Sequence, residues 1–322
     1  MKFLTFAKQT PTKMSLLILS PTRETDSWVQ AIKEIDPEIA LFVYPEPIDN
    51  DAVEFILAWN HPYGSLQNYP NLKCVSSMGA GVDYLLKDPK LPENIALTRI
   101  VDPELSKTMF EFILAMVMNH LRRLTHFKQL QSDQIWEPMT YRRIEDVRIG
   151  IMGFGEIGSY VAEHMMQLGF KVNGWSQSEK TNTKAKIFIG EKQFAEFMQN
   201  TDILVCLLPS TSKTRGLLNK QTLSYLPKGA SLINVARGDI LLENDLIELL
   251  DKEHLSWASL DVFLQEPLPF DHPFWNHKKI DITPHVASLT NPKTVALQII
   301  ENYWRMKKGK VLLHQVSQEK GY

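Results

Sequence analysis

The stretch VRIGIMGFGEIGSYV, residues Val147–Val161, places three glycines between an apolar run and a segment of helical character. The apolar run predicts a β-strand, and the residues after the last glycine predict a helix. An ordinary turn can share this bare spacing, but the strand–turn–helix context favours a site for the pyrophosphate of a dinucleotide. Tight turning, close ligand approach and close helix packing each require a glycine, and the helix N-terminus would supply amides. The residues expected to hold the cofactor here are Gly153, Gly155, Glu156, Ile157 and Gly158.

The segment GWSQSEK ends the next expected strand, where the choice between NADH and NADPH is normally made. An acidic side chain at this position would bind the ribose 2′-hydroxyl and repel a 2′-phosphate. Here Ser176, Gln177 and Ser178 are neutral, and Lys180 could receive a phosphate. The segment therefore predicts a preference for NADPH. Glu179 argues in the other direction, so NADH stays possible.

Composition narrows the class of protein. The 322 residues exceed what one hydrophobic core usually covers, which predicts two domains. The formal net charge of −2 offers no basic surface for nucleic acid or an anionic membrane. Cys74 and Cys206 lie in apolar runs without a partner motif, which indicates buried thiols in a reducing compartment and a cytoplasmic protein. No residue cluster suggests a metal site.

Short β-rich runs alternate with helical patterns along the chain, as in α/β proteins with parallel sheets. Four strand candidates precede a long helix after Pro103, and six more follow Val147. The final helical pattern could return to the first domain and make it discontinuous. The expected division is a substrate domain of residues 14–112 and 292–322, a dinucleotide-binding domain of residues 113–291, and an N-terminal extension of residues 1–13.

Three polar residues follow late apolar runs, where ligands bind in such folds: Arg237, Glu266 and His285. Each has an ordinary structural alternative, such as a capped turn or a surface loop. Together with a nicotinamide, these three residues would suit the reduction of a keto acid by hydride transfer. Arg237 would hold a carboxylate and a keto oxygen, His285 would donate a proton, and Glu266 would fix the tautomer of the imidazole.

The motifs GFGEIG, INVARGDIL, LDVFLQEPLP and ITPHVAS, in this order, resemble those of the D-isomer-specific 2-hydroxyacid dehydrogenase family. Within it, SSMGAGVDYLL, LAWNHP and WNHKKIDITPHVAS resemble the branch that reduces glyoxylate and hydroxypyruvate with NADPH, although Gln177 replaces an arginine frequent in that branch. The resemblance implies an α/β fold with a Rossmann dinucleotide-binding domain, a smaller flavodoxin-like substrate domain and a cleft between them. It also implies a small 2-keto acid substrate and a homodimer, with Trp136 near the partner.

The same resemblance assigns further site residues. It places the substrate carboxylate on the backbone of Ala80 and Gly81, with Trp59 as a pocket wall, although this turn and this tryptophan also fit plain packing. The cofactor residues that it adds are Leu208, Pro209, Val235, Ala236 and Asp261, the last beside the nicotinamide carboxamide. Two alternatives stay open: a dehydrogenase for a larger 2-keto acid, and a non-enzymatic protein that senses NAD(H).

Overall fold

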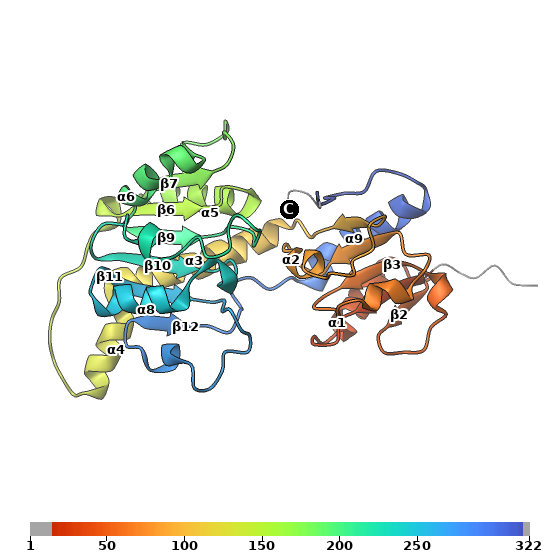
Figure 1. The fold of residues 1–322 in the computed structure, drawn as a ribbon, viewed down its shortest axis with the longest axis horizontal. Helices are drawn as coiled ribbons and strands as arrows, with labels where there is room; N and C mark the ends of the chain where they lie inside the picture. Colours follow the sequence, from red (N-terminus) through yellow and green to blue (C-terminus); the bar gives the residue numbers. More distant parts are fainter. Residues whose placement is uncertain (1–14, 318–322) are drawn as a thin grey trace, which may run out of the picture. The chain divides into compact units, whose positions relative to one another are not determined.

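The structure is a computed structural model that describes residues 15–317 and divides into two compact units (Figure 1). The first unit contains the described residues up to Asp102 and those from Thr290 onward, and the second contains Pro103–Leu289. The expected extension, residues 1–13, lies outside the described residues. No helix of the described part of the chain is long and apolar enough to cross a membrane.

The first unit is a five-stranded parallel sheet with the order β2-β1-β3-β4-β5, the flavodoxin-like arrangement. Its helices α1 and α9 pack against each other although they come from opposite ends of the chain. The strand β5 was not among the expected strands. The elements are β1 (Ser15–Leu19), α1 (Asp26–Ile35), β2 (Leu41–Val43), η1 (Asn50–Ala52), β3 (Val53–Ala58), η2 (Ser65–Asn68), β4 (Cys74–Ser77), α2 (Asp83–Leu86), β5 (Ala96–Thr98) and α9 (Pro292–Lys307).

The second unit is a seven-stranded parallel sheet with the order β12-β11-β10-β9-β6-β7-β8. The order reverses between β6 and β9, as in the Rossmann fold, where ligands bind at the switch point. The strand β8 was not expected from the sequence. The elements are α3 (Pro103–Arg122), α4 (Leu124–Ser132), η3 (Ile144–Asp146), β6 (Arg148–Met152), α5 (Glu156–Gln167), β7 (Lys171–Ser176), β8 (Lys186–Ile189), η4 (Glu191–Gln193), α6 (Phe194–Gln199), β9 (Ile203–Cys206), α7 (Lys220–Leu223), β10 (Ala230–Asn234), η5 (Gly238–Ile240), α8 (Glu243–Asp251), β11 (Leu255–Leu260), η6 (Pro273–Asn276) and β12 (Ile280–Ile282).

Both faces of the larger sheet are buried. Along β9 the side chains of Ile203 and Val205 enter one hydrophobic cluster, and those of Leu204 and Cys206 enter another. Successive side chains of a strand point to opposite faces, so the two clusters lie on the two sides of the sheet. Helices α3 and α5 contribute to the first cluster, and α6, α7 and α8 contribute to the second. Because helices cover both faces of the sheet, nearly every residue of its central strands is buried, and these strands are continuous apolar runs in the sequence.

Helix α3 lies wholly in the second unit, whereas the sequence placed the first domain boundary after residue 112, inside this helix. Its buried residues Met109, Ile113, Val117 and Leu121 recur at helical spacing and join the cluster that also contains residues of α5. Because this apolar stripe runs along the helix, α3 packs against the second sheet. The boundary between the units therefore falls at Pro103, the first residue of α3. The second division comes after Leu289, close to the expected residue 291.

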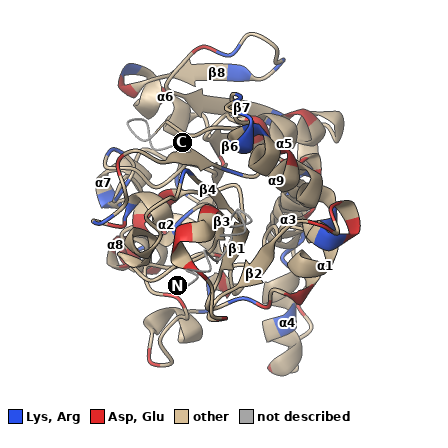
Figure 2. Cartoon of the chain, turned by 90° about the vertical axis from the view of Figure 1, so that its right-hand side faces the viewer, with Lys and Arg blue, Asp and Glu red and all other residues tan. Residues whose placement is uncertain are grey.

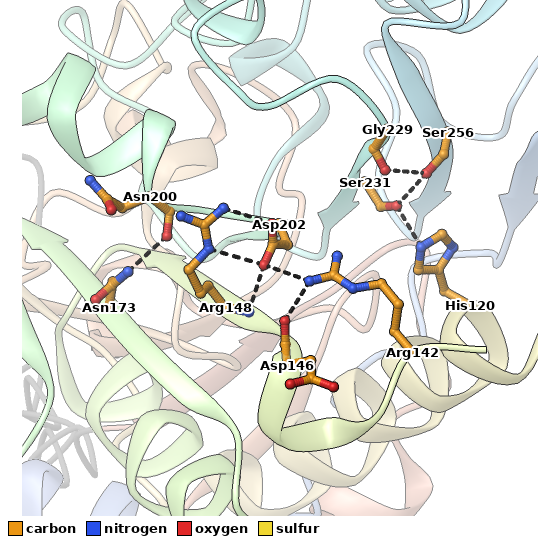
Figure 3. A network of polar contacts seen from close by, with 10 residues as sticks. All are labelled: His120, Arg142, Asp146, Arg148, Asn173, Asn200, Asp202, Gly229, Ser231 and Ser256. Atoms are coloured by element: carbon orange, nitrogen blue, oxygen red, sulfur yellow. Dashed lines mark hydrogen bonds and ion pairs between the residues drawn. The ribbon is translucent and has the colours of Figure 1, made fainter.

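The amino ends of the central strands are joined by a polar network (Figure 3). Asp202, just before β9, accepts bonds from the Nε, Nη2 and amide of Arg148 at the start of β6, and one from Arg142. On the other side, His120 of α3 bonds Ser231, which bonds Ser256. Elsewhere acidic and basic residues are interspersed over the described elements (Figure 2). The network holds the edge of the sheet opposite the expected site.

Candidate active site

The glycine-rich turn after β6 has no room for side chains at two of its three glycines. Gly153 has φ of +106°, and a Cβ there would lie 2.8 Å from the backbone carbonyl of Leu207. A Cβ on Gly158 would lie 2.0 Å from the carbonyl oxygen of Gly153, so α5 approaches the turn too closely for alanine. At Gly155 a Cβ would meet nothing within 4 Å. Open space in front of the turn's backbone is what an approaching pyrophosphate needs, so the residues fit a dinucleotide.

A pocket of about 310 Å³ lies beside this turn. It is lined by Phe154, Gly155, Glu156, Ser159 and residues 179–183. Ile157, the second residue of α5, is half-buried. The pocket is therefore lined by both charges that bear on cofactor choice, Lys180 and Glu179, which lie in the loop between β7 and β8.

The predicted ribose-binding residues lie at the end of β7 and just beyond it. Ser176 is buried, and its Oγ accepts a long bond of 3.4 Å from the amide of Ser178. Gln177, Ser178 and Lys180 are exposed. Residues 176–178 thus directly precede the pocket-lining residues 179–183, and they include no carboxylate.

Two further expected cofactor segments follow β9 and β10. Leu208 is buried and Pro209 is exposed; the carbonyl of Pro209 accepts a 2.6 Å bond from Thr214, which shapes that loop. Val235 and Ala236 are both buried. These residues border the carboxyl edge of the same sheet that carries the glycine-rich turn.

Arg237 is held in the turn after β10. The buried Asn234 accepts a bond from the amide of Ala236 and donates one to the carbonyl of Arg237. The Arg237 side chain is half-buried and donates from one Nη to the carbonyl of Ala236 at 2.6 Å. The next residue, Gly238, packs against the loop after β11, since a Cβ there would lie 1.9 Å from the backbone of Phe263. The turn after β10 and the loop after β11 are therefore locked together.

Glu266 and His285 form a direct pair. The Nδ1 of His285 lies 2.7 Å from one carboxylate oxygen of Glu266, and the other oxygen accepts a 3.0 Å bond from the amide of Phe263. Burial alone would raise the pKa of Glu266, but the bonds from His285 and the Phe263 amide, with the nearby charges of His285 and Arg237, hold that pKa below its usual value. An ionised carboxylate only accepts, so Nδ1 carries the proton in this bond.

Asp261 anchors the loop that carries His285. It is 1% exposed and directly follows β11. Its carboxylate accepts bonds from the hydroxyl of Thr283 at 2.7 Å and from the amides of Val286 and Ala287 at 2.9 Å each. His285 itself has φ of +55°, a strained conformation for a residue with a Cβ. The hydrogen bonds from the loop to Asp261 hold His285 in this conformation.

The arrangement of strands accounts for how these side chains meet. Arg237, Glu266 and His285 follow β10, β11 and β12, which are neighbours in the sheet. A model of the D-isomer specific 2-hydroxyacid dehydrogenase NAD-binding domain matches residues 114–287. The chain belongs to this family. The 2-hydroxyacid dehydrogenase is thus an NAD(P)-dependent oxidoreductase, and the family resemblance and the Rossmann fold expected from the sequence are confirmed.

Known proteins resemble this dehydrogenase over nearly its whole length. The glyoxylate/hydroxypyruvate reductase A of Photorhabdus laumondii is 36% identical over 314 residues, 96% of this chain and 100% of the relative. That of Serratia proteamaculans is 35% identical, covering 92% and 96% of the two chains. A D-isomer specific 2-hydroxyacid dehydrogenase from Xanthobacter autotrophicus, solved with NADPH and MES, has a TM-score of 0.91 and 35% identity, covering 96% of this chain and all of that one.

A reductase of known structure from Sinorhizobium meliloti is also similar. It is described as an NADPH-dependent glyoxylate/hydroxypyruvate reductase in complex with NADP and sulfate. Its TM-score is 0.89 at 30% identity, covering 96% of this chain and 100% of that chain.

The expected substrate residues of the dehydrogenase lie in its first unit. Ala80 and Gly81, both half-buried, follow β4. The turn is folded by Ser77, whose Oγ accepts from the amide of Gly79 at 3.1 Å and donates to the carbonyl of Gly81 at 2.7 Å. Trp59 follows β3, and a Cβ on Gly79 would lie 3.0 Å from its Cζ3. These residues form one group at the carboxyl edge of that unit's sheet.

Some residues of these two groups were not singled out from the sequence. Asn234 and Thr283 organise the turns of the second unit; the only signal for Asn234 is an amide inside the apolar run ASLINVA. Arg23 lies over the Trp59 ring, 3.6 Å from its centroid, and no periodicity points to it.

The remaining expected features concern thiols and metals. Cys74 and Cys206 are free and buried, and burial raises the pKa of each thiol to about 12, so neither supplies a thiolate. Within residues 15–317, no group of three or more His, Cys, Asp or Glu side chains could hold a metal ion.

Proposed function

We propose that this dehydrogenase reduces glyoxylate to glycolate and hydroxypyruvate to D-glycerate, with NADPH as the preferred reductant. The observation that carries the proposal is the 2.7 Å pair of His285 and Glu266 on the sheet that also carries the glycine-rich turn. Relatives with about 35% identity carry the name of this activity. A reduced nicotinamide supplies a hydride when it is bound.

His285 delivers the proton. Because its Nδ1 is engaged by Glu266, Nε2 is the ring nitrogen that serves the substrate oxygen. As negative charge develops on that oxygen, the imidazolium donates its Nε2 proton and the pair with Glu266 keeps the ring in position. Glu266 stays ionised in this role, in keeping with its lowered pKa.

Substrate binding is divided between charges and backbone amides. Arg237 orients the 2-keto acid through charge-assisted bonds from its guanidinium, which has five donors in a fixed plane. In the first unit, the backbone of Ala80 and Gly81 holds the carboxylate, and Trp59 walls the pocket. We accordingly assign substrate binding chiefly to residues 15–102 and 290–317 and cofactor binding to residues 103–289, the latter through the turn and loop segments described above.

The NADPH preference is supported by Lys180 in the pocket beside the turn and by the absence of a carboxylate at residues 176–178. The solved relatives bound to NADPH or NADP point the same way. Glu179 lines the same pocket and keeps NADH as a weaker alternative.

We further propose a homodimer formed around α4 and the segment that follows it. Helix α4 has no buried residue, yet apolar side chains are exposed here: Leu124, Phe127, Ile135, Trp136 at 97% and Tyr141. Exposed apolar side chains gathered on one segment favour an interface, and light scattering in solution would give the mass of the assembly. The cytoplasmic location also stays a proposal, compatible with the two unpaired thiols.

The experiment that tests the function follows nicotinamide absorbance at 340 nm. Purified protein is given NADPH or NADH with glyoxylate, hydroxypyruvate, pyruvate or phenylpyruvate. We expect NADPH oxidation with the two small substrates. Turnover with phenylpyruvate alone would identify a dehydrogenase for larger acids, and no turnover with any acid at saturating cofactor would identify a binding protein.

A further inference from the structure

A positive charge lies beside the expected carboxylate site of the first unit. The neighbouring parallel strands β1, β3 and β4 are followed by Arg23, Trp59 and the turn at Gly79. The guanidinium carbon of Arg23 is 3.6 Å from the centre of the Trp59 ring, and a Cβ on Gly79 would lie 3.0 Å from the edge of the same indole. One indole therefore separates this cation from the turn that ends at Gly81.

The indole is held firmly between them. Trp59 packs against Tyr84 at 5.3 Å between ring centres, and the Tyr84 hydroxyl lies 3.2 Å from Ser77 Oγ. Ser77 is the residue whose hydroxyl folds the turn through Gly79 and Gly81. The cation, the ring and the turn thus form one packed group, and stacking on an aromatic face restricts the position of the guanidinium.

The charge of Arg23 lacks an acidic partner in the part of the chain that the structure describes; its neighbours there are aromatic. The adjacent Glu24 instead binds the amides of Asp26 and Ser27 at the start of α1. Burial lowers the pKa of Arg23, although a guanidinium stays charged at neutral pH. A half-buried cation of this kind is stabilised by a bound anion.

We propose that Arg23 binds a second carboxylate on the substrate, so that this dehydrogenase also reduces 2-keto dicarboxylic acids. The proposal rests on the function proposed above, in which the backbone at Ala80 and Gly81 takes the carboxylate next to the keto group. The carbons between the two acid groups would pack along Trp59. The C2 carbonyl is reduced to a secondary alcohol by the cofactor's hydride and the His285 proton, and the distal carboxylate is unchanged.

The test compares two substrates of equal chain length. In 2-oxopentanoate a methyl group stands where 2-oxoglutarate has its distal carboxylate, so their ratio of kcat/KM isolates the distal charge. We expect the wild-type ratio to favour 2-oxoglutarate by about tenfold or more, and Arg23→Gln to lower that ratio by about tenfold. Arg23→Lys, which keeps the charge without the planar stack, should give an intermediate ratio. Lys310→Gln removes an exposed cation of the same unit and should leave the ratio unchanged.

A purely structural role gives a different result. If Arg23 only supports Trp59, Arg23→Gln lowers kcat/KM for both acids equally and leaves their ratio unchanged, which overturns the proposal. A wild-type enzyme that reduces glyoxylate but does not prefer 2-oxoglutarate overturns this inference alone. An enzyme that reduces no 2-keto acid overturns the proposed function as well. If Arg23→Gln does not fold, the ratio of kcat/KM for the two acids is compared between the wild type and Arg23→Lys, and an unchanged ratio overturns the proposal.

Discussion

Asp261 holds His285 in place from two directions. The backbone carbonyl of Asp261 accepts a 2.9 Å bond from the amide of His285, and its carboxylate bonds the amides of Val286 and Ala287 just beyond. The side chain assigned by resemblance to the nicotinamide carboxamide is thus already bonded to three donors of the histidine loop, including the hydroxyl of Thr283. Its position in the sequence gives no sign of this anchoring role.

Asp261→Asn should weaken both the loop and the activity. The asparagine side chain has one acceptor oxygen where the carboxylate has two. Its NH₂ group would therefore face a donor whose hydrogen bond the carboxylate accepts in the wild type. A buried donor left without an acceptor costs about 1–3 kcal/mol, which urea unfolding would detect. We expect kcat to fall together with stability. An unchanged kcat would show that other contacts position His285.

His285→Gln should abolish most turnover and leave cofactor binding intact. Loss of a positioned general acid lowers rates about 10²–10⁴-fold. The decrease is measured at 340 nm, and cofactor binding is measured by its fluorescence. His277→Gln is the matched control, since His277 also pairs with a carboxylate, that of Asp251. Equal activity of the two variants would exclude His285 as the proton donor.

Alanine at two of the glycines should separate folding from cofactor binding. In Gly158→Ala the Cβ collides with the carbonyl of Gly153, so the melting temperature should fall. In Gly155→Ala the Cβ enters open space, so the fold should be retained while affinity for NADPH decreases. Melting curves and cofactor titrations check both. Unimpaired NADPH binding by Gly155→Ala would place the pyrophosphate elsewhere.

The two charges beside the turn should act oppositely on cofactor choice. Lys180→Gln should raise the KM for NADPH several-fold with little effect on NADH, because only NADPH carries the 2′-phosphate. Glu179→Gln should lower the KM for NADPH. Steady-state kinetics with each cofactor gives both ratios. If neither substitution alters the ratio, the preference is set outside this pocket.

The carboxylate of Asp202 should contribute stability that disappears in acid. Burial alone would raise its pKa, but its bonds to Arg148 and Arg142 hold the pKa below the usual aspartate value. Since the folded-state pKa is depressed, the stabilisation is complete above the unfolded value of about 3.9 and is lost as pH falls through the folded value. Wild type should therefore exceed Asp202→Asn in unfolding free energy at pH 7 and lose this advantage in acid. A pH-independent difference would contradict the assignment.

The sequence predicted the features that depend on residue type. Gly153 and Gly158 could be identified because backbone contacts at this turn exclude other residues. Arg237, Glu266 and His285 could be singled out as candidates because each follows an apolar run, although the 2.7 Å pairing of His285 with Glu266 depends on the adjacency of β11 and β12.

What escaped prediction depends on contacts between distant segments. Strands β5 and β8 were not expected, although the equally short β2 and β4 were; β5 and β8 are defined by their pairing with β4 and β7. The stack of Arg23 on Trp59 joins residues on two different strand ends, which no local pattern encodes. The boundary at Pro103 depends on which of the two sheets the buried face of α3 packs against, and the apolar spacing along the helix does not determine this.

Helix α9, which packs on α1, also affects the order in which the two units can fold during synthesis. When the ribosome has released residues up to Leu289, the larger sheet has all its strands, but the first-synthesised sheet still lacks its last helix. Folding during synthesis usually proceeds from the N-terminus. Here strands β1 to β5 leave the ribosome before α9 does, so the nucleotide-binding unit, Pro103–Leu289, can be completed before the first unit.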